Sequence, residues 1–260
     1  MRVIIEYDPW SRLGNRMFQY AFAYLLAKQF NCELFYNEGL PNFGIEPKPV
    51  DALQANIIKA RSLGHQHFDF NAIENFDGDI IIDSFVQQSK YYIKDQQILR
   101  EVFGIKALDT INEDTLVLHV RANDYIELEW FLGYDFYKKL IKDTKFTKVK
   151  IVTDDPTCET ISKLLSDGHE LVSSGPATAF NVSGDRRAID DFKTLLYSEN
   201  IALSQSSFSW WAAFLGYHKN IIFPYTTNNI KQPWPITPEK DDVDLYFDID
   251  GISSKYINKL

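Results

Sequence analysis

The sequence predicts an α/β protein made of two doubly wound parallel sheets. Apolar strand-like stretches alternate with helix-like stretches through most of the 260 residues, which is typical of α/β layering. Several such repeats lie on each side of residues 104–114, so this stretch is read as a linker. Because doubly wound sheets bind ligands at the carboxyl ends of their strands, both halves are expected to turn loops toward a shared cleft.

The first half of the chain is expected to begin with a strand and a buried helix. Its strands are expected at 2–7, 32–37 and 78–86, and its helices at 15–30, 50–58 and 90–104. The helix at 15–30 is apolar on most of its sides, which indicates burial. Gly104 can end the last of these helices, because glycine readily takes the left-handed conformation found at many helix ends.

The second half repeats the alternation more regularly. It opens with the apolar stretch "TLVLHV", and Gly168 ends one of its helices. Its strands are expected at 115–120, 148–153, 169–173, 200–204 and 220–224, and its helices at 135–143, 157–167, 189–199 and 206–217.

The composition excludes several classes of protein. The chain has a formal net charge of −9 and no basic run longer than two residues, which argues against a nucleic-acid binder. Cys32 and Cys158 lie far apart without metal-ligand spacing, which predicts a reducing compartment and no disulfide framework. The N-terminal stretch lacks the signal-peptide pattern, and the longest apolar run is too short to span a bilayer. We therefore expect a soluble, cytoplasmic protein without a transmembrane segment.

The stretch "SRLGNRMFQ" (11–19) is a candidate anion site at the start of a helix. Gly14 permits a tight turn, and Asn15 can cap the helix that follows. The first N–H groups of that helix would suit a phosphate, and Arg12 and Arg16 flank it. The alternative is an ordinary capped helix with two surface arginines, since one glycine is a weak signal.

The stretch "TLVLHVRANDYIE" (115–127) places charge at the end of a buried strand. His119 and Arg121 are two residues apart and so point to the same face, and Asp124 follows in the next loop. A guanidinium here could grip a diphosphate in bidentate fashion, with a hydrogen bond from His119 beside it. A core histidine paired with Asp124, together with a structural Arg–Asp bridge, is an equally open interpretation.

Two further strand ends carry polar residues. Ser206 and Ser207 precede an aromatic helix, and their hydroxyls would make another anion-binding helix start unless they only cap it. Asp154 and Asp155 follow the strand at 148–153, where they could bind hydroxyl groups or, by default, cap the next helix. The acidic triplets at 77–79 and 248–250 resemble the metal-binding pairs of some nucleotide-sugar enzymes. Neither is well placed at the carboxyl end of a strand, so no metal site is predicted.

Taken together, these stretches resemble the α-1,2-fucosyltransferase family. The blocks that carry the resemblance are "RLGNRMFQYAFAYLLAK" (12–28), "HVRANDY" (119–125), "FLGYDFYKKLI" (131–141) with "IVTDDP" (151–156), and "DFKTLLYSENIALSQSSFSWWAAFLG" (191–216). The resemblance runs from about residue 2 to about residue 224, and the last block is specific. It implies a GT-B-like fold, in which two Rossmann-like lobes face a central cleft.

The resemblance also implies an activity and its site. The implied enzyme is an inverting glycosyltransferase that moves L-fucose from GDP-fucose to a glycan hydroxyl, in an α-1,2 linkage that is often on galactose. No metal and no cofactor beyond the donor substrate are implied, and GDP is the product. The expected donor-binding residues are Gly14, Asn15, His119, Arg121, Asp154, Asp191, Ser206, Ser207 and Phe208.

Arg121, Asp124 and Glu129 are the expected catalytic residues. Arg121 matches the first arginine of the family's His-x-Arg-Arg-x-Asp signature and would neutralise the leaving GDP. Asp124, Glu127 and Glu129 qualify by position as the base that takes the acceptor proton. Glu129 lies eight residues past Arg121, a spacing found in a related fucosyltransferase group. A dissociative transition state would need no base, so this role stays open.

The chain departs from the family pattern near the expected diphosphate. Ala122 stands in place of the second signature arginine and Asn123 in place of a glycine, while Arg12 replaces a glycine and Gln205 an asparagine. One cation fewer would weaken donor binding or change the preferred donor. Two alternatives therefore stay open: a GT-B transferase that uses another nucleotide sugar, and an inactive glycan-binding homologue.

The expected organisation assigns one substrate to each lobe. Residues 1–108 would form an acceptor-side lobe, and 109–240 a lobe that binds the nucleotide sugar. The tail at 241–260 is expected to pack back on the first lobe. The expected partners are the nucleotide sugar and a glycan acceptor, without nucleic acid, and a lipid-linked acceptor would add peripheral membrane association.

Overall fold

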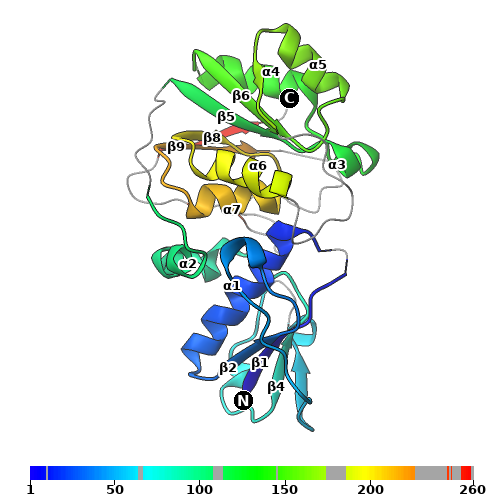
Figure 1. Cartoon of the computed structure of the whole chain (residues 1–260), viewed down its shortest axis with the longest axis vertical. Coiled ribbons are helices and arrows are strands. Elements are labelled where there is room, and N and C mark those ends of the chain that lie inside the picture. Colours follow the sequence, from blue (N-terminus) through cyan, green and yellow to red (C-terminus); the bar gives the residue numbers. More distant parts are fainter. Residues whose placement is uncertain are drawn as a thin grey trace.

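The protein consists of two α/β lobes that follow one another along its long axis (Figure 1). The computed structural model describes residues 1–9, 11–63, 67–107, 114–144, 146–173, 186–225, 245, 247 and 253–258. The expected lobe boundary at 108/109 lies outside these residues.

The first lobe is built on a four-stranded parallel sheet with the order β2-β1-β4-β3. Its strands are β1 (Arg2–Ile5), β2 (Glu33–Tyr36), β3 (Ile57–Lys59) and β4 (Asp79–Ile82). The chain moves from β1 to β2 on one side and later returns to β4 on the other side. The loops after β1 and β4 therefore flank the point where the strand order reverses, which is where such sheets bind ligands.

The second lobe is built on a six-stranded parallel sheet with the order β10-β9-β8-β5-β6-β7. Its strands are β5 (Thr115–Val120), β6 (Lys148–Thr153), β7 (Glu170–Leu171), β8 (Asn200–Ala202), β9 (Asn220–Tyr225) and β10 (Ser253–Asn258). All six residues of β5 are buried, as expected for a central strand that is covered on both faces. The strand order reverses between β5 and β8.

The α-helices are α1 (Leu13–Gln29), α2 (Gln96–Val102), α3 (Asn123–Glu127), α4 (Gly133–Thr144), α5 (Glu159–Ser166), α6 (Arg186–Leu196) and α7 (Ser207–Leu215). In Figure 1, α1 packs on the sheet of the first lobe, and α4, α5, α6 and α7 cover the sheet of the second lobe. Short 3-10 helices are η1 (Pro41–Phe43), η2 (Ala60–Leu63), η3 (Asn71–Ile73), η4 (Ser89–Tyr91) and η5 (Ile93–Asp95). The helix expected at 90–104 is thus divided into η4, η5 and α2.

The helix expected at 50–58 does not form. The Arg2 guanidinium donates to the carbonyl of Ala52 at 2.9 Å, and Asp79 accepts from the backbone N–H of Gln54 at 2.7 Å. Arg2 and Asp79 also form an ion pair at 2.7 Å. These side chains take up backbone groups that a helix would use, so the segment stays irregular until β3 begins.

A shared aromatic core joins the two lobes. Phe18 of α1 lies 4.8 Å from Trp210 and 4.9 Å from Trp211 of α7, measured between ring centroids. Arg100 of α2 donates to the carbonyls of Leu215 and Gly216 at the end of α7. One cluster of buried residues therefore runs from the first sheet through α1 and α7 to the second. A second cluster covers the opposite face of the second sheet, beneath α4 and α5.

The described part of the tail belongs to the second lobe, which corrects the expectation that 241–260 packs on the first. β10 pairs in parallel with β9 along all six of its residues. Before it, Phe247 packs 5.5 Å from Trp210 and 5.1 Å from Phe223. The unpaired edge of β9 and the apolar surface of α7 together explain this placement, because both are stabilised by being covered.

Candidate functional site

The candidate site lies where the carboxyl ends of β5, β6 and β8 meet the start of α1. Arg121 follows β5 directly, and Asp154 follows β6, its neighbour in the sheet. The loop after β8 leads into α7, and the loop after β1 leads into α1. Both reversal points of strand order therefore face this region. Figure 1 shows one end of α1 directed toward the second lobe, and α3 at the ends of the strands of that lobe.

Arg121 is held by carboxylates on both sides. Its guanidinium pairs with Asp154 and, at 2.5 Å, with Asp124, and its side chain is 13% exposed. It also lies 5.1 Å from the ring centre of Tyr125, within cation–π range. Asp154 in turn accepts from the backbone N–H of Ala122 at 2.8 Å. The guanidinium of Arg121 is therefore fixed in direction, and only a small part of its side chain is exposed.

Asp124 connects the two lobes. One of its oxygens pairs with Arg121, and the other lies 3.5 Å from the guanidinium of Arg12, which comes from the first lobe. Partial burial lowers the pKa of Arg12, and the positive charge of Arg121 lowers it further. The sequence indicated Arg12 only as a neighbour of a helix start. Its reach across the lobes depends on tertiary packing, which the sequence pattern did not show.

His119 lies behind Arg121 in the interior. It is 3% exposed, and its Nδ1 shares a hydrogen bond with Ser204 Oγ at 2.7 Å. Burial lowers the pKa of His119 to about 3, with a smaller contribution from the charge of Arg121. Its ring stacks obliquely 5.7 Å from Phe208. The pairing of His119 with Asp124 that the sequence left open is replaced by this Ser204 contact, and the expected donor contact of His119 stays a prediction.

Gly14 allows the starts of α1 and α7 to touch. A Cβ at this position would lie 2.5 Å from Ser207 Oγ and 2.6 Å from the backbone nitrogen of Phe208. Gly14 lies inside α1, so it is required for close approach and not for the tight turn that the sequence suggested. The first N–H groups of a helix have no partner within the helix, and the dipole makes this end positive. Two positive helix ends therefore converge beside the arginines.

Asn15 does not have the capping role expected from the sequence, and the side chain of Ser206 does not make the capping bond that was its alternative role. α1 begins at Leu13, with Arg12 as its N-cap, so Asn15 lies within the first turn. Its Oδ1 accepts from Gln87 Nε2 at 3.0 Å, which links the first turn of α1 to the loop after β4. Ser206 is the N-cap of α7 but makes no side-chain capping hydrogen bond. Its hydroxyl is consequently not committed to the backbone of α7.

Tyr125 ties α3 to the loop before α7. Its hydroxyl donates to the carbonyl of Gln205 at 2.7 Å, and burial raises the pKa of Tyr125 to about 12. Tyr125 was not predicted as a site residue, although its position four residues after Arg121 was a usable signal. Asp191 lies on α6 and is 8% exposed, next to Phe192, which packs 5.4 Å from Phe208.

The remaining acidic candidates lie apart from the ion pairs of Arg121. Glu129 follows α3 as an exposed residue with a φ of 60°, a conformation that side chains other than glycine rarely adopt. Asp155 accepts from the backbone N–H of Thr157 at 2.9 Å, which is the local turn role expected by default. Within the ranges that the structure describes, His, Cys, Asp and Glu side chains form no group of three or more suited to a metal ion.

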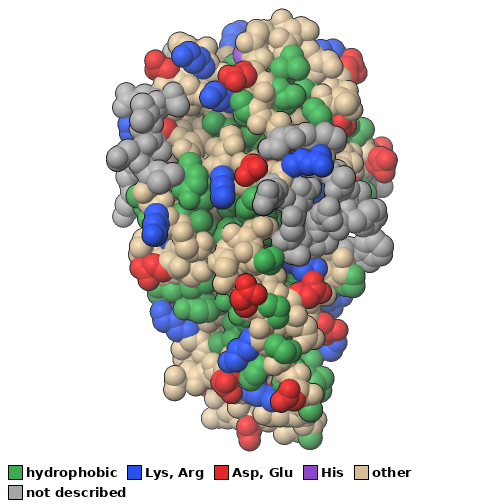
Figure 2. Space-filling view, in the orientation of Figure 1, with side chains coloured by type: hydrophobic (Ala, Val, Ile, Leu, Met, Phe, Trp, Pro, Cys, Tyr) green, Lys and Arg blue, Asp and Glu red, His purple; other side chains and the backbone are tan. Residues whose placement is uncertain are grey.

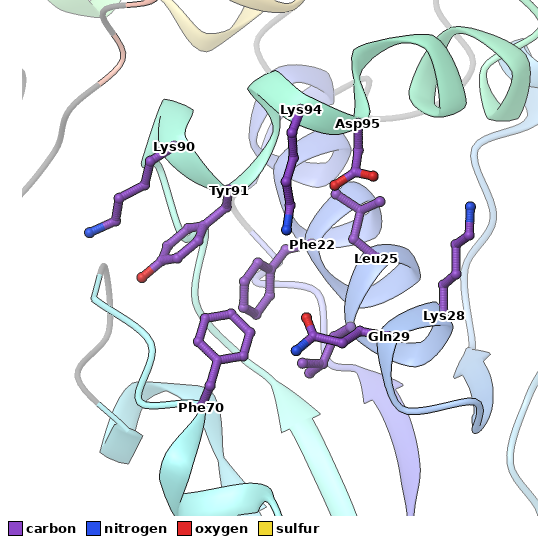
Figure 3. Close-up of a pocket in the computed structure, with 10 residues that line it drawn as sticks. Phe22, Leu25, Lys28, Gln29, Phe70, Lys90, Tyr91, Lys94 and Asp95 are labelled. Carbon is purple, nitrogen blue, oxygen red and sulfur yellow. The ribbon is translucent and has the colours of Figure 1, made fainter.

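A separate cavity of about 530 Å³ lies on the first lobe (Figure 3). Its walls come from the later turns of α1, from Phe70 and from η4 and η5, and Lys94 points into it. Phe22 lies nine residues after Leu13, or about 13 Å along α1. This cavity is therefore distinct from the site around Arg121.

The surface charge and the length of the helices bear on the expected partners. On the face shown in Figure 2, lysines and arginines are interspersed with acidic side chains. Among the helices that the structure describes, none combines the length and the hydropathy needed to cross a bilayer.

Comparison with known proteins identifies the fold. No protein-family model and no curated protein matches the chain. Solved structures do match. Fucosyltransferase NodZ from Bradyrhizobium is 15% identical, with a TM-score of 0.53 over 83% of this chain and 93% of that one. A mutant of Arabidopsis thaliana FUT1 in complex with GDP is 12% identical, with a TM-score of 0.54 over 88% of this chain and 71% of that one.

A third match is NodZ α-1,6-fucosyltransferase soaked with GDP-fucose, which is 14% identical, with a TM-score of 0.51 over 83% of this chain and 92% of that one. At such identities the likeness shows the fold alone. The chain therefore has the GT-B fold, and these fucosyltransferases share it. The expected fold class is confirmed.

Proposed function

We propose that the protein is an inverting glycosyltransferase that moves L-fucose from GDP-fucose to a hydroxyl of a glycan acceptor. The observation that carries this proposal is the convergence of Arg121 with the starts of α1 and α7 at the facing strand ends of a GT-B fold. Two solved structures that share the fold contain GDP-fucose or GDP. The residue blocks of the α-1,2-fucosyltransferase family support an α-1,2 linkage, often on galactose.

The reaction breaks the bond between fucose C1 and an oxygen of the β-phosphate. The acceptor oxygen attacks C1 from the opposite face, and its proton passes to a base or to water. Negative charge grows on the departing GDP, so fixed positive groups lower the barrier. Arg121 and the two helix starts supply that charge, held in place by Asp154 and by the contact at Gly14.

The two expected catalytic carboxylates, Asp124 and Glu129, are assigned different roles. Both oxygens of Asp124 are engaged by arginines, so we assign it to the positioning of Arg121 and Arg12. Glu129 is exposed after α3 and is the remaining candidate base among the expected catalytic residues. The acceptor would bind from the side of the first lobe, and no metal would be required.

The decisive experiment compares the wild type with Arg121→Ala and Arg121→Lys in GDP binding and fucosyl transfer. Removal of one fixed donor to a developing anion typically costs about 10²- to 10³-fold in rate, so we expect transfer to fall by at least that much in Arg121→Ala. Lysine should restore little, because it lacks the bidentate geometry. Arg61→Ala serves as the control, since Arg61 lies exposed on η2. Near-normal turnover in a folded Arg121→Ala protein would refute the site.

The same assay tests the finer assignments. A panel of galactose-terminated acceptors, with the product linkage read by NMR, distinguishes α-1,2 from α-1,6 transfer. Activity that survives EDTA supports metal independence, and activity that is lost and then restored by a divalent cation contradicts it. Partition of the protein onto vesicles that carry a lipid-linked acceptor tests membrane association.

A GT-B transferase that uses a different nucleotide sugar is the second candidate. Ala122 favours it, because this position carries a cation in the family pattern and a buried methyl group here. Calorimetry with GDP, UDP and ADP separates the two candidates. Preferred binding of UDP or ADP would replace the GDP-fucose proposal. Binding of glycans without turnover of any donor would indicate the inactive homologue.

A further inference from the structure

We propose that Arg12, which belongs to the first lobe, supplies the second cation that grips the donor diphosphate. This inference rests on the proposed function only in requiring that the site bind a nucleoside diphosphate, whichever base it carries. It assigns a role to a residue that the sequence pattern treats as a departure, since a glycine stands there in the family block.

Position 122 cannot provide that cation in this fold. Ala122 is 0% exposed and belongs to the apolar cluster beneath α4, together with Leu132 and Phe136. Its backbone N–H is already bound to Asp154. An arginine here would bury a charge in an apolar cluster, which is costly without a partner. Position 122 therefore supplies no second cation beside Arg121.

Arg12 is placed to do this because of where α1 begins. It is the N-cap of α1, two residues before Gly14, and Gly14 touches the start of α7. Its side chain is 42% exposed and reaches across the lobes to Asp124 at 3.5 Å. The other oxygen of Asp124 pairs with Arg121. One carboxylate thus holds two guanidinium groups next to two positive helix ends.

The neighbouring arginine is used differently, which makes the assignment specific. Arg16 is buried within the first lobe, where it donates to the carbonyl of Ser11 at 3.2 Å and pairs with Glu38 at 2.6 Å. Its guanidinium also lies 4.9 Å from the ring centre of Tyr7. Arg16 is therefore committed to the first lobe, whereas Arg12 extends to the second.

The two arginines suit a diphosphate. Each guanidinium can offer two parallel N–H groups to phosphate oxygens, and it stays charged at all physiological pH values. Asp124 orients both cations, and with Asp154 it balances their two formal charges in the free protein. The positive ends of α1 and α7 add further attraction for a diphosphate. Because Arg12 arrives from the first lobe, the packing of α1 on α7 sets its distance to Arg121.

The test is calorimetric binding of GDP and of guanosine to the wild type, Arg12→Gln, Arg12→Lys and the control Arg61→Ala. For Arg12→Gln we expect GDP to bind about tenfold more weakly and guanosine to bind unchanged, because charge-assisted hydrogen bonds to phosphate are lost. The salt dependence of GDP binding should also become shallower. Arg12→Lys should recover part of the affinity, and Arg61→Ala should match the wild type.

Two outcomes would overturn the inference. If the Arg12→Gln protein binds GDP as tightly as the wild type, Arg12 does not contact the diphosphate. Equal weakening of GDP and guanosine shows that the change acts through the fold. Binding of GDP, UDP and ADP to the wild type is measured first. If the wild type binds none of the three, the proposed function itself is refuted, before any variant is compared.

Discussion

The direction of the Arg121 side chain depends on two neighbouring carboxylates. Asp154 binds the guanidinium and also the backbone N–H of the next residue, so side chain and turn are oriented together. Asp124 adds a contact that is shared with the first lobe. An arginine that is held in this way loses little rotamer freedom when an anion binds, which favours preorganised electrostatic stabilisation.

The buried ring of His119 predicts a pH dependence of stability. Its pKa is about 3 in the folded chain and 6.5 as the ordinary value, so the unfolded chain binds a proton between these values and the folded chain does not. Stability should therefore fall as the pH is lowered through this window, by up to about 1.4 kcal/mol per pH unit from this group. Above pH 6.5 the group should contribute no slope.

Thermal unfolding of the wild type and His119→Asn at a series of pH values checks this. The variant should show a shallower decline between about pH 6.5 and 4, whatever its stability at neutral pH. Parallel curves for the two proteins would contradict the lowered pKa of His119 in the folded state.

At the scale of secondary-structure elements, the meeting of α1 and α7 places the site. α1 is the long helix of the first lobe among the described residues, and its positive end points toward the second lobe. α7 begins beside that end. The contact is so close that it leaves no room for a side chain at Gly14. The helix starts are therefore positioned by packing, and the arginines that follow β5 and precede α1 are brought together as a consequence.

Gly14→Ala tests this contact by the sign of its effect. Within a helix, alanine is normally favoured over glycine by about 1 kcal/mol. Here we expect the opposite, a loss of about 1–3 kcal/mol in the free energy of unfolding, because the new methyl group would overlap Ser207 and the backbone of Phe208. Urea denaturation measures it, with Lys28→Ala at the exposed end of α1 as the control. A stabilised Gly14→Ala protein would contradict the contact.

At the scale of the whole molecule, the two lobes are joined by a common interior. The buried cluster that includes Phe18 also contains residues of β1, β4, α6, α7 and β9. Such continuity differs from two domains that touch through a polar interface, which would be expected to move independently. The shared core explains how an arginine of the first lobe keeps a defined position relative to the second.

Phe18→Ala should therefore destabilise both lobes at once. The ring of Phe18 is fully buried, and its centroid lies at most 5.4 Å from the ring centroids of Tyr92, Trp210 and Trp211. We therefore expect a loss of about 3–5 kcal/mol in the free energy of unfolding. Differential scanning calorimetry should show one transition in the wild type and one, at lower temperature, in the variant. Two separated transitions, of which only one shifts, would show that the lobes unfold independently.

Most of the architecture was predictable because its signals are local. The apolar stretch at 115–120 formed a central strand, and the helix expected at 15–30 formed over Leu13–Gln29. The stretch 50–58 was misread, because Arg2 and Asp79, distant in sequence, bind its backbone. The tail was misplaced for a similar reason, since its pairing with β9 is a long-range contact.

The sequence alone indicates which residues stand at the site and that they stand at the ends of strands. Both follow from sequence periodicity and turn chemistry, which act over a few residues. Arg121, Asp154 and the serines before α7 belong to this group. The partners of those residues were decided by tertiary packing. Asp124 binds both Arg121 and Arg12, and His119 binds Ser204, because the distances between them depend on how sheets and helices of both lobes come together.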